Sequence, residues 1–391
     1  MASVPWAEVA VAATERPLGA LMRAALALPI LAVPARAGAA DVREIGFSLL
    51  GYRESHSLMK ISEPILWATI PFADTWEIRA SGAVDIITGA SPAIVTNAGG
   101  KPVQTITGAS ISDRRKTGDL KVSKRLDDWT LSLSRLISKE EDYLSYAWGA
   151  EAKVDLANKN TTLVAGYGRS NDRIRSVDDR ELDGHRDTKE YLFGVTQVLS
   201  PRAVLQSTLT WSRGKGWYND PYKTTITFYP DSSVPGLSLD LRPHERDMFT
   251  WLTRYRLHFP QARATLQADY RYFRDDWGIR AHALELAWSQ DLGERWSLRP
   301  ALRYYTQSAA DFYSPLIARP APALLSSDHR LAAFGGLSPS LRATWRGEAF
   351  TLDATLGYYR NARSLKLGGA ASPEFETFTA TYVLLSIAHE F

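Results

Sequence analysis

The chain has 391 residues, of which 45% are hydrophobic and 23% are charged, and its formal net charge is only +3. Because no run of Lys and Arg reaches five, this balance gives no indication of a nucleic-acid partner. No segment has eighteen consecutive apolar residues, so a bundle of transmembrane helices is excluded. The absence of cysteine excludes disulfides, thiolate metal sites and cysteine nucleophiles.

The N-terminal segment has the features of an export signal. Arg23 precedes an apolar run over residues 24–33, and Ala37 and Ala39 stand as an A-x-A cleavage site. A start at Met22 would give the more usual length, so residues 1–21 are interpreted as an upstream mis-start or an extended n-region. We predict a signal peptide with this extension over residues 1–39 and one mature domain over residues 40–391.

From about Asp41 onward the sequence falls into alternating runs of roughly 10 to 15 residues, separated by polar or Gly/Pro punctuation. In the run QARATLQADYRYF, Leu266 and Tyr270 lie on one face of a strand, whereas Asp269 and Arg271 lie on the other. A soluble fold would have to bury the charged faces or expose the aromatic ones, and both are costly. Such runs are typical of strands that have lipid on one side and water on the other.

Short and long connections alternate along these runs. The short turns are PFADT, LDD, LANKN, LSPR, FPQ, DLGER and WRGE, and the longer links include residues 91–114, 171–186, 214–246 and 308–329. Outer-membrane barrels have tight periplasmic turns and long extracellular loops. We therefore predict an all-β fold, a transmembrane up-and-down antiparallel β-barrel of about sixteen strands, within a range of about 14 to 18, whose termini lie on the periplasmic side.

Tryptophan residues gather where strands meet turns, which is typical of the aromatic girdles of membrane barrels. A soluble sandwich explains such positions singly but not their repetition. We place four at the short-turn end and two deeper or at the far end, and in that order they are Trp76, Trp129, Trp296, Trp345, Trp211 and Trp288.

The last residues, TYVLLSIAHEF, alternate with a nearly apolar face made of Val383, Leu385, Ile387 and Phe391, with His389 as the exception. Taken alone, the segment would also suit the last strand of a soluble sandwich. A terminal aromatic residue on an alternating strand resembles the membrane-insertion signal of outer-membrane barrels. We accordingly expect the barrel-assembly machinery and outer-membrane lipid as partners, and the bacterial outer membrane as the location.

Residues 62–92, SEPILWATIPFADTWEIRASGAVDIITGASP, carry Glu63-Pro64, Trp67, Pro71 and the GASP sequence at Gly89. With the preceding GYRES and the terminal strand, this stretch resembles a family of bacterial outer-membrane β-barrel proteins described only as a domain of unknown function. The resemblance covers the mature chain. It implies an envelope setting beside small lipoproteins, thioredoxin-like proteins and flavin-attaching enzymes, and so a periplasmic or lipoprotein partner.

Motifs for catalysis are nearly absent. SLMK at Ser57 and KTG at Lys116 match parts of the penicillin-recognising signature, but Ser57 and Lys60 would face opposite sides of a strand, and no S-D-N intervenes. The seven histidines are scattered, and no phosphate loop is present. The carboxylates of DDRELDGHRD could bind Ca²⁺ weakly, but a solvated extracellular loop with its own Arg partners explains them better. We expect no enzyme activity, metal or cofactor.

Alternation places many charged residues on the inner wall, with an excess of arginine in the second half. A charged wall can orient water and select polar solutes, whereas charges that pair across strands would merely hold the wall. We predict a pore or facilitated channel for small polar solutes. The alternative is a structural or partner-binding barrel, which is either plugged by residues 214–246 or docked to an envelope redox carrier. An outer-membrane enzyme is the third hypothesis. The predicted lumen-lining residues are Arg254, Arg256, Arg263, Asp269, Arg271, Glu285, Arg299, Arg303, Arg342 and Asp353.

Overall fold

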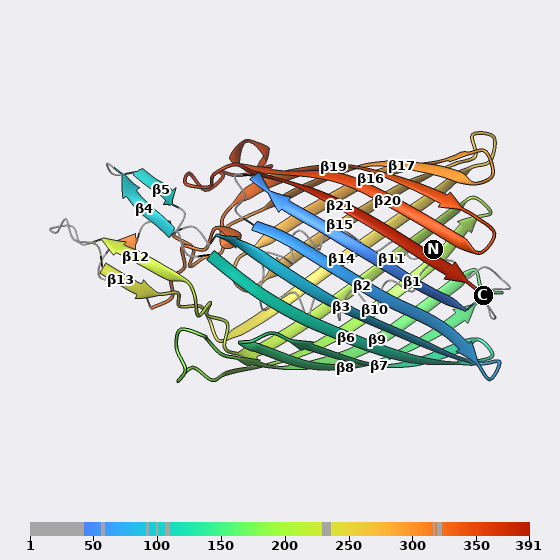
Figure 1. Ribbon diagram of the computed structural model, residues 1–391, viewed down its shortest axis with the longest axis horizontal. Helices are drawn as coiled ribbons and strands as arrows, with labels where there is room; N and C mark the ends of the chain where they lie inside the picture. The colour runs from blue at the N-terminus through green and yellow to red at the C-terminus, as the bar shows by residue number, and fades with distance from the viewer. Residues whose placement is uncertain are drawn as a thin grey trace.

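The computed structural model describes residues 43–55, 59–90, 94–98, 101–105, 110–228, 236–315, 317–318 and 323–391, and in these ranges sixteen antiparallel strands close into one barrel (Figure 1). The prediction of an all-β barrel of about sixteen strands is confirmed. The predicted signal peptide, residues 1–39, lies outside the described residues. No helix in the described ranges is long and apolar enough to cross a membrane.

The barrel strands are neighbours around the wall in chain order. They are β1 (Glu44–Glu54), β2 (Met59–Phe72), β3 (Trp76–Ala90), β6 (Ser110–Leu126), β7 (Trp129–Lys139), β8 (Tyr143–Leu156), β9 (Thr161–Ile174), β10 (Gly184–Ser200), β11 (Ala203–Gly216), β14 (Glu245–Phe259), β15 (Ala264–Asp275), β16 (Arg280–Leu292), β17 (Trp296–Gln307), β19 (Phe334–Arg346), β20 (Phe350–Ala362) and β21 (Phe378–Glu390). Antiparallel pairing of β1 with β21 closes the ring.

Shorter elements lie in the loops. Strand β4 (Ile94–Ala98) pairs with β5 (Lys101–Thr105), and β12 (Thr224–Phe228) pairs with both β13 (Gly236–Leu239) and β18 (Ile317–Ala318). Two 3₁₀ turns, η4 (His329–Leu331) and η5 (Arg363–Leu365), follow β18 and β20. Figure 1 shows β4, β5, β12 and β13 projecting beyond one end of the barrel.

The short turns lie at the other end of the barrel, where β1 begins and β21 ends (Figure 1). All seven predicted short turns join consecutive strands, from the β2–β3 turn to the β19–β20 turn. Asp74, Asp127 and Asn158 adopt positive φ angles in these turns, a conformation that short polar side chains tolerate better than most residues. On the loop side, the connections after β7 and β15 are as short as the turns, so the predicted contrast in length is not uniform.

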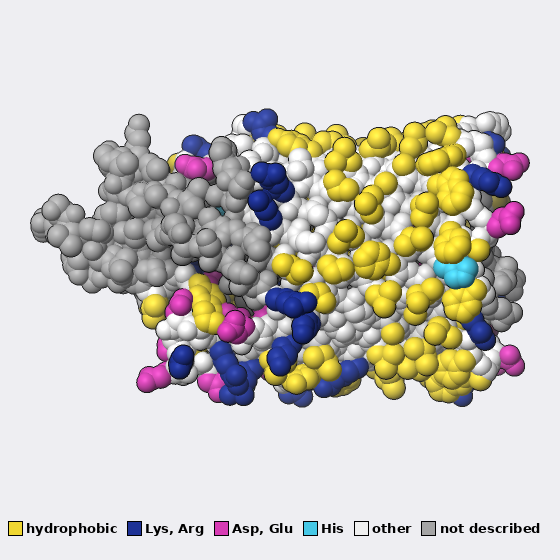
Figure 2. Space-filling model, viewed as in Figure 1, with side chains coloured by type: hydrophobic (Ala, Val, Ile, Leu, Met, Phe, Trp, Pro, Cys, Tyr) yellow, Lys and Arg dark blue, Asp and Glu magenta, His cyan; other side chains and the backbone are white. Residues whose placement is uncertain are grey.

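Alternation divides the wall into two faces. Phe47 and Leu49 of β1 expose 43% and 39% of their surface to the outside, whereas the hydroxyl oxygen of Ser48 lies 2.6 Å from that of Ser386 inside the ring. The same parity holds from β1 to β21, and the predicted outward residues of β21, from Val383 to Phe391, are exposed. Figure 2 shows the resulting belt of apolar side chains on the face of the barrel that is in view.

Outward aromatic rings form two levels on this belt. A row of rings crosses β8 to β11. Successive ring centroids are 5.3 Å apart between Trp148 and Tyr167, 5.2 Å between Tyr167 and Tyr191, and 5.3 Å between Tyr191 and Trp211. At the short-turn end, Trp76, Trp129 and Trp296 lie at the first residues of their strands, and Trp345 pairs with Trp296 in the register.

Trp288 does not lie with Trp211. It occupies the short-turn half of β16, where its ring centroid is 5.4 Å from that of Phe259, the last residue of β14. Of the two expected places, the far end is therefore wrong, because β16 runs from the loops toward the turns. Trp288 is nevertheless deeper than Trp296, which pairs with Leu292 at the end of β16.

Neighbouring residues in the middle of β11 test this two-faced wall. Leu209 is 42% exposed on the outside, and Thr210 faces the lumen. In a bilayer, Leu209→Arg should cost about 2 to 4 kcal/mol of unfolding free energy, whereas Thr210→Arg should be nearly neutral. Reversible denaturant unfolding in lipid vesicles measures both values. Equal costs at the two positions would contradict the assigned faces.

Candidate functional site in the lumen and at its mouth

Arginines on β14 share one carboxylate on β15. Arg254 and Asp269 are partners in the register, with Arg254 Nε 3.6 Å from a carboxylate oxygen. Arg256, one inward position closer to the short turns, donates a hydrogen bond of 3.1 Å from its Nη2 to the same carboxylate. One Asp therefore faces two guanidinium groups.

Two further pairs continue this wall toward β20. Arg299 Nη2 donates to Glu285 at 2.7 Å, and its Nε donates to the Gln267 amide oxygen at 3.0 Å. Arg342 Nε donates to Asp353 at 2.9 Å. These cross-strand contacts are the pairing that the sequence left as an alternative to a solute-selecting wall.

Arg271 and Arg303 add positive charge to the same wall. The guanidinium of Arg303 lies 5.9 Å from the ring centroid of Tyr305, and among the described residues no carboxylate lies within 4.0 Å of Arg303. On the inward strand positions from β14 to β20, the predicted set thus contributes six arginines (254, 256, 271, 299, 303 and 342) against three carboxylates (269, 285 and 353). The difference within this set is 6 − 3 = +3.

Arg263 is the member of the predicted set that the structure places elsewhere. It lies in the turn between β14 and β15 with a φ of 49° and is exposed, and its Nη2 donates to the Gly293 carbonyl of the neighbouring turn. Alternation could not show that the strand begins only at Ala264. The prediction that Arg263 lines the lumen is wrong.

The first half of the wall holds deeply buried ion pairs. Lys121 Nζ lies 3.1 Å from Glu151, Arg115 contacts Asp85, and Arg186 Nε donates to Asp172 at 3.0 Å with both side chains fully buried. Asp172 and Arg186 were missed because residues 171–186 read as a loop. Their inward parity, continued from Ser170 and Thr188, was the available signal.

Trp67 and Glu63, two of the residues that carry the family resemblance, also face inward. The Trp67 indole nitrogen donates to Glu44 at 2.9 Å, and its ring lies so close to Gly46 that a Cβ there would sit 2.1 Å from it. Glu63 is buried on the same strand. Trp67 therefore fastens β2 to β1, and Glu63 interacts electrostatically with Arg115 of β6. In the described structure these two side chains hold the inner wall together.

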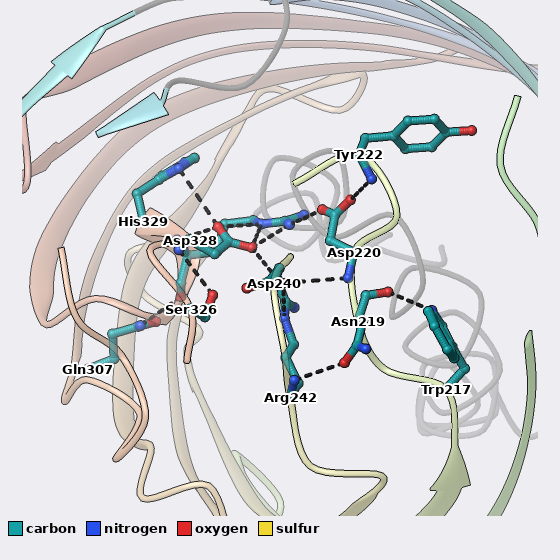
Figure 3. Close-up of polar contacts among 11 residues, drawn as sticks. Trp217, Asn219, Asp220, Tyr222, Asp240, Arg242, Gln307, Ser326, Asp328 and His329 are labelled. Atoms are coloured by element: carbon teal, nitrogen blue, oxygen red, sulfur yellow. Dashed lines mark hydrogen bonds and ion pairs between the residues drawn. The ribbon is translucent and has the colours of Figure 1, made fainter. Parts of the chain in front are cut away.

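Two loops meet over the barrel mouth in an ion-pair network (Figure 3). Asp328 accepts hydrogen bonds from Arg242 at 2.8 Å and from Arg330 Nε at 2.8 Å. Arg242 Nε also donates to Asp240 at 2.6 Å, and Arg330 Nη2 donates to Asp220 at 2.7 Å. Lys223, which interacts electrostatically with Asp328, Asp220 and Asp240, completes a network of three acids and three bases, here called the mouth cluster.

The mouth cluster is buried, so its charges depend on one another. Asp328 is 0% exposed and Asp240 is 1% exposed. Burial by itself would raise the pKa of Asp328, but Arg330, Lys223 and Arg242 outweigh it and hold that pKa well below its usual range. Burial raises the pKa of Asp240 despite the nearby Arg242. The cluster ties residues 219–242 to residues 326–330 across the mouth.

The predicted plug, residues 214–246, does not descend into the lumen as far as it is described. Tyr218 lies against the inner rim, 5.0 Å from the guanidinium of Arg186, and packs with Trp277 and Leu331. Strands β12 and β13 then project away from the barrel (Figure 1), and the chain returns through Asp240 and Arg242. The described contacts of this segment therefore lie at the mouth and not deep in the channel.

The acidic stretch of residues 178–187, which runs from the β9–β10 loop into β10, has arginine partners of its own. Asp183 accepts hydrogen bonds from Arg173 at 2.6 and 2.7 Å, and Asp187 accepts one from Arg169 at 2.7 Å. No group of three or more His, Asp or Glu residues in the described part of the chain could hold a metal ion. Of the predicted S-x-x-K pair, Lys60 lies on the outer face of β2, and Ser57 falls outside the described residues.

His329 gives the mouth cluster a pH dependence. Burial, together with Lys223 and Arg330, lowers the pKa of His329 from 6.5 to about 4, although Asp328 opposes this. Between pH 6.5 and about pH 4, His329 binds a proton when the loop is released but not when it is part of the mouth cluster. The free energy that holds the loop in the cluster therefore decreases as the pH falls. The raised pKa of Asp240 acts in the opposite direction at lower pH.

We expect protection of residues 323–333 from hydrogen exchange, corrected for intrinsic rates, to fall about tenfold between pH 7 and pH 4.5. His329→Gln, which cannot titrate, should remove most of this change while leaving Asp240 in place. An equal loss of protection in both proteins would show that His329 does not control closure.

Comparison with solved structures identifies the same barrel architecture. The "Bacterial polysaccharide outer membrane secretin" matches with a TM-score of 0.50 and 8% identity, over 89% of this chain and 98% of that chain. "CdiB from Acinetobacter baumannii" matches with a TM-score of 0.48 and 10% identity over 88% and 60%, and the "CymD monoaromatic hydrocarbon channel" with 0.43 and 8% over 90% and 89%. At these identities the likeness concerns the fold alone.

The search of the curated proteins gave no match. The family described as "Protein of unknown function (DUF3570)" matches residues 18–184 and 178–382, which together span most of the chain and nearly all of the barrel. This agrees with the resemblance carried by the stretch around Trp67, whereas the match ends at residue 382, within the terminal strand. The chain belongs to the DUF3570 family.

Proposed function

We propose that the chain is a pore of the bacterial outer membrane that passes small polar solutes and prefers anions. The observation that carries this proposal is the net basic inner wall from β14 to β20, in a closed barrel whose outer face is an apolar belt. Lipid would cover the belt, the short turns would lie in the periplasm, and the outward face of β21 would serve the barrel-assembly machinery.

The size of the barrel supports a conducting lumen. At sixteen strands the inward side chains no longer fill the interior. Several inward residues on the basic half are small, including Ala283, Ala287, Ala301 and Ser338. Guanidinium groups stay charged at physiological pH, so those that exceed the available carboxylates require water or an anion.

The opposite half of the wall supports the same function. Its inward positions from β2 to β10 carry eight carboxylates (63, 77, 85, 119, 151, 155, 172 and 190) and six bases (79, 115, 121, 125, 153 and 186), counting only side chains that the structure describes. An acidic half facing a basic half sets up a field across the channel. Such a field orders water and favours solutes with polar or charged groups.

Reversal potentials across a planar bilayer test the anion preference. Arg254→Gln leaves the Arg256–Asp269 pair intact, and Arg303→Gln removes a base that has no carboxylate within 4.0 Å among the described residues. The double variant lowers the excess within the predicted set from +3 to 4 − 3 = +1. It should shift the reversal potential toward cations, and the shift should shrink in salt above about 0.1 M, where the Debye length falls below about 10 Å.

Arg254→Lys with Arg303→Lys keeps both charges and should conduct with the wild-type preference. Arg169→Gln changes a base on the outer face and serves as a second control. The anion preference is refuted if the Gln double variant is folded, conducts, and has an unchanged reversal potential. A wild-type barrel that is folded in the bilayer but never conducts would refute the pore itself.

The mouth cluster favours a second candidate, a closed barrel that serves as a scaffold. Its partner would be a periplasmic or lipoprotein component of an envelope redox system, as the family resemblance implies. In this case the loops bridged by Asp328 would seal the mouth permanently, and the inner charges would only stabilise the wall.

Asp328→Asn separates the two candidates. It leaves Arg242 and Arg330 with too little buried negative charge, which should cost about 3 to 5 kcal/mol and open the mouth. A pore should then show larger or more frequent openings than the wild type, while Asp183→Asn, which breaks an exposed pair with Arg173, should change nothing. Silence in both the wild type and Asp328→Asn would favour the scaffold.

A further inference from the structure

The outer face of β1, β2, β3, β6 and β7 carries positive charge near the loop end. At the outward positions of these strands the sequence has no Asp or Glu. Toward the loops the same positions carry six exposed bases, here called the basic face: Arg53, Lys60, Arg114, Lys116, Arg135 and Lys139.

The register brings like charges together on the basic face. Arg53 is the Cα partner of Lys60 across β1 and β2, and Lys116 is the partner of Lys139 across β6 and β7. Like charges directly opposite each other destabilise a sheet. Lys60, Lys116 and Lys139 have no carboxylate within 4.0 Å in the described part of the chain, so the protein itself does not compensate them there.

The outward bases of β9 to β11 are arranged differently. Arg169 and Arg173 pair with Asp187 and Asp183 at 2.7 and 2.6 Å. Arg213 and Lys215 share Glu245 at 3.0 and 2.7 Å. Among the described outward bases of β9 to β11, only Lys189, the register partner of Arg169 and Arg213, has no carboxylate within 4.0 Å. Lysines without a carboxylate partner are therefore more numerous on the basic face, where there are three, than on this side of the barrel.

The basic face borders the apolar belt directly. On β7, Ile137, which is 43% exposed, lies between Arg135 and Lys139, and Leu133, which is 67% exposed, follows toward the turns. Figure 2 shows Lys and Arg side chains gathered where the belt ends on the loop side. A ligand at this level can place acyl chains on the belt and its anionic groups among the lysines.

We propose that the basic face binds the phosphate groups of a phosphorylated lipid of the leaflet that surrounds the loop end of the barrel. Phosphate supplies the negative charge that the outward positions of these strands lack. The continuity with the apolar belt selects a lipid over a soluble anion, because only a lipid satisfies both surfaces at once. The inference rests on the proposed membrane location and is independent of whether the lumen conducts.

Electron spin resonance of labelled lipids tests this site in phosphatidylcholine vesicles that contain the intact barrel. The probe is spin-labelled phosphatidic acid, which has a phosphomonoester headgroup, and the reference is spin-labelled phosphatidylcholine. The wild type should select the phosphatidic acid severalfold in the motionally restricted shell. The triple variant Lys60→Gln, Lys116→Gln and Lys139→Gln should lower this preference by about threefold or more, as added salt should.

Two matched variants control for charge and folding. Lys60→Arg, Lys116→Arg and Lys139→Arg keeps the charge and should retain the preference. Arg169→Gln, Arg173→Gln and Arg213→Gln removes three outward bases that are already paired, and it should lose much less than the Lys-to-Gln variant. The proposal is overturned if the Lys-to-Gln variant keeps the wild-type preference, or if the paired-base variant loses as much.

Conductance measured on the same vesicles distinguishes the two proposals. A barrel that selects phosphatidic acid through the three lysines but never conducts supports the basic face and refutes the pore. A barrel that conducts without lipid preference refutes the basic face alone. Failure of the folded protein to enter the bilayer refutes both.

Discussion

The closure of the sheet between β1 and β21 is the constraint on which the rest of the structure depends. A strand edge facing lipid would leave its amide and carbonyl groups without hydrogen-bond partners, so a spanning sheet has to close on itself. The pairing of Glu44 with Glu390 at one end and of Glu54 with Ala380 at the other provides that closure along the whole seam. Once the ring is closed, each strand has one face inside and one outside, and alternation decides which residue lies where.

The distribution of charged side chains follows from this division into an inner and an outer face. The outer belt excludes unpaired charge at mid-depth, so charged side chains gather on the inner wall or at the rim. Inside, most of them meet partners across strands, as Arg299 meets Glu285 and Lys121 meets Glu151. The exceptions are uneven around the ring: a basic excess lies inside β14 to β20, and unneutralised lysines lie outside β2, β6 and β7. Both functional proposals rest on these two charge imbalances.

Period-two patterns predicted the fold well because each strand satisfies a local rule. The seven turns, the strand number and the outward face of β21 all follow from alternation and turn residues. The site was harder to predict. The segment that contains Asp172 and Arg186 is as rich in polar residues as a loop. Only the fully buried ion pair between these two residues, across β9 and β10, shows that they belong to the barrel wall. The prediction for Arg263 was wrong for the opposite reason. Alternation does not show where a strand begins, so a turn residue was assigned to the wall. The mouth cluster joins Asp220 to Arg330, residues 110 positions apart, and no local pattern contains that contact.

The seam has a consequence for how the chain reaches its native state. The hydroxyl groups of Ser48 and Ser386 meet although 338 positions separate them in sequence, so the first strand cannot find its last neighbour until nearly the whole chain is present. The fifteen other strand pairings join neighbours in the chain order of the barrel strands, and can form hairpin by hairpin. Loop-closure entropy therefore concentrates in a single late event, which makes ring closure the natural slow step of folding and leaves two open edges exposed to other chains until it occurs.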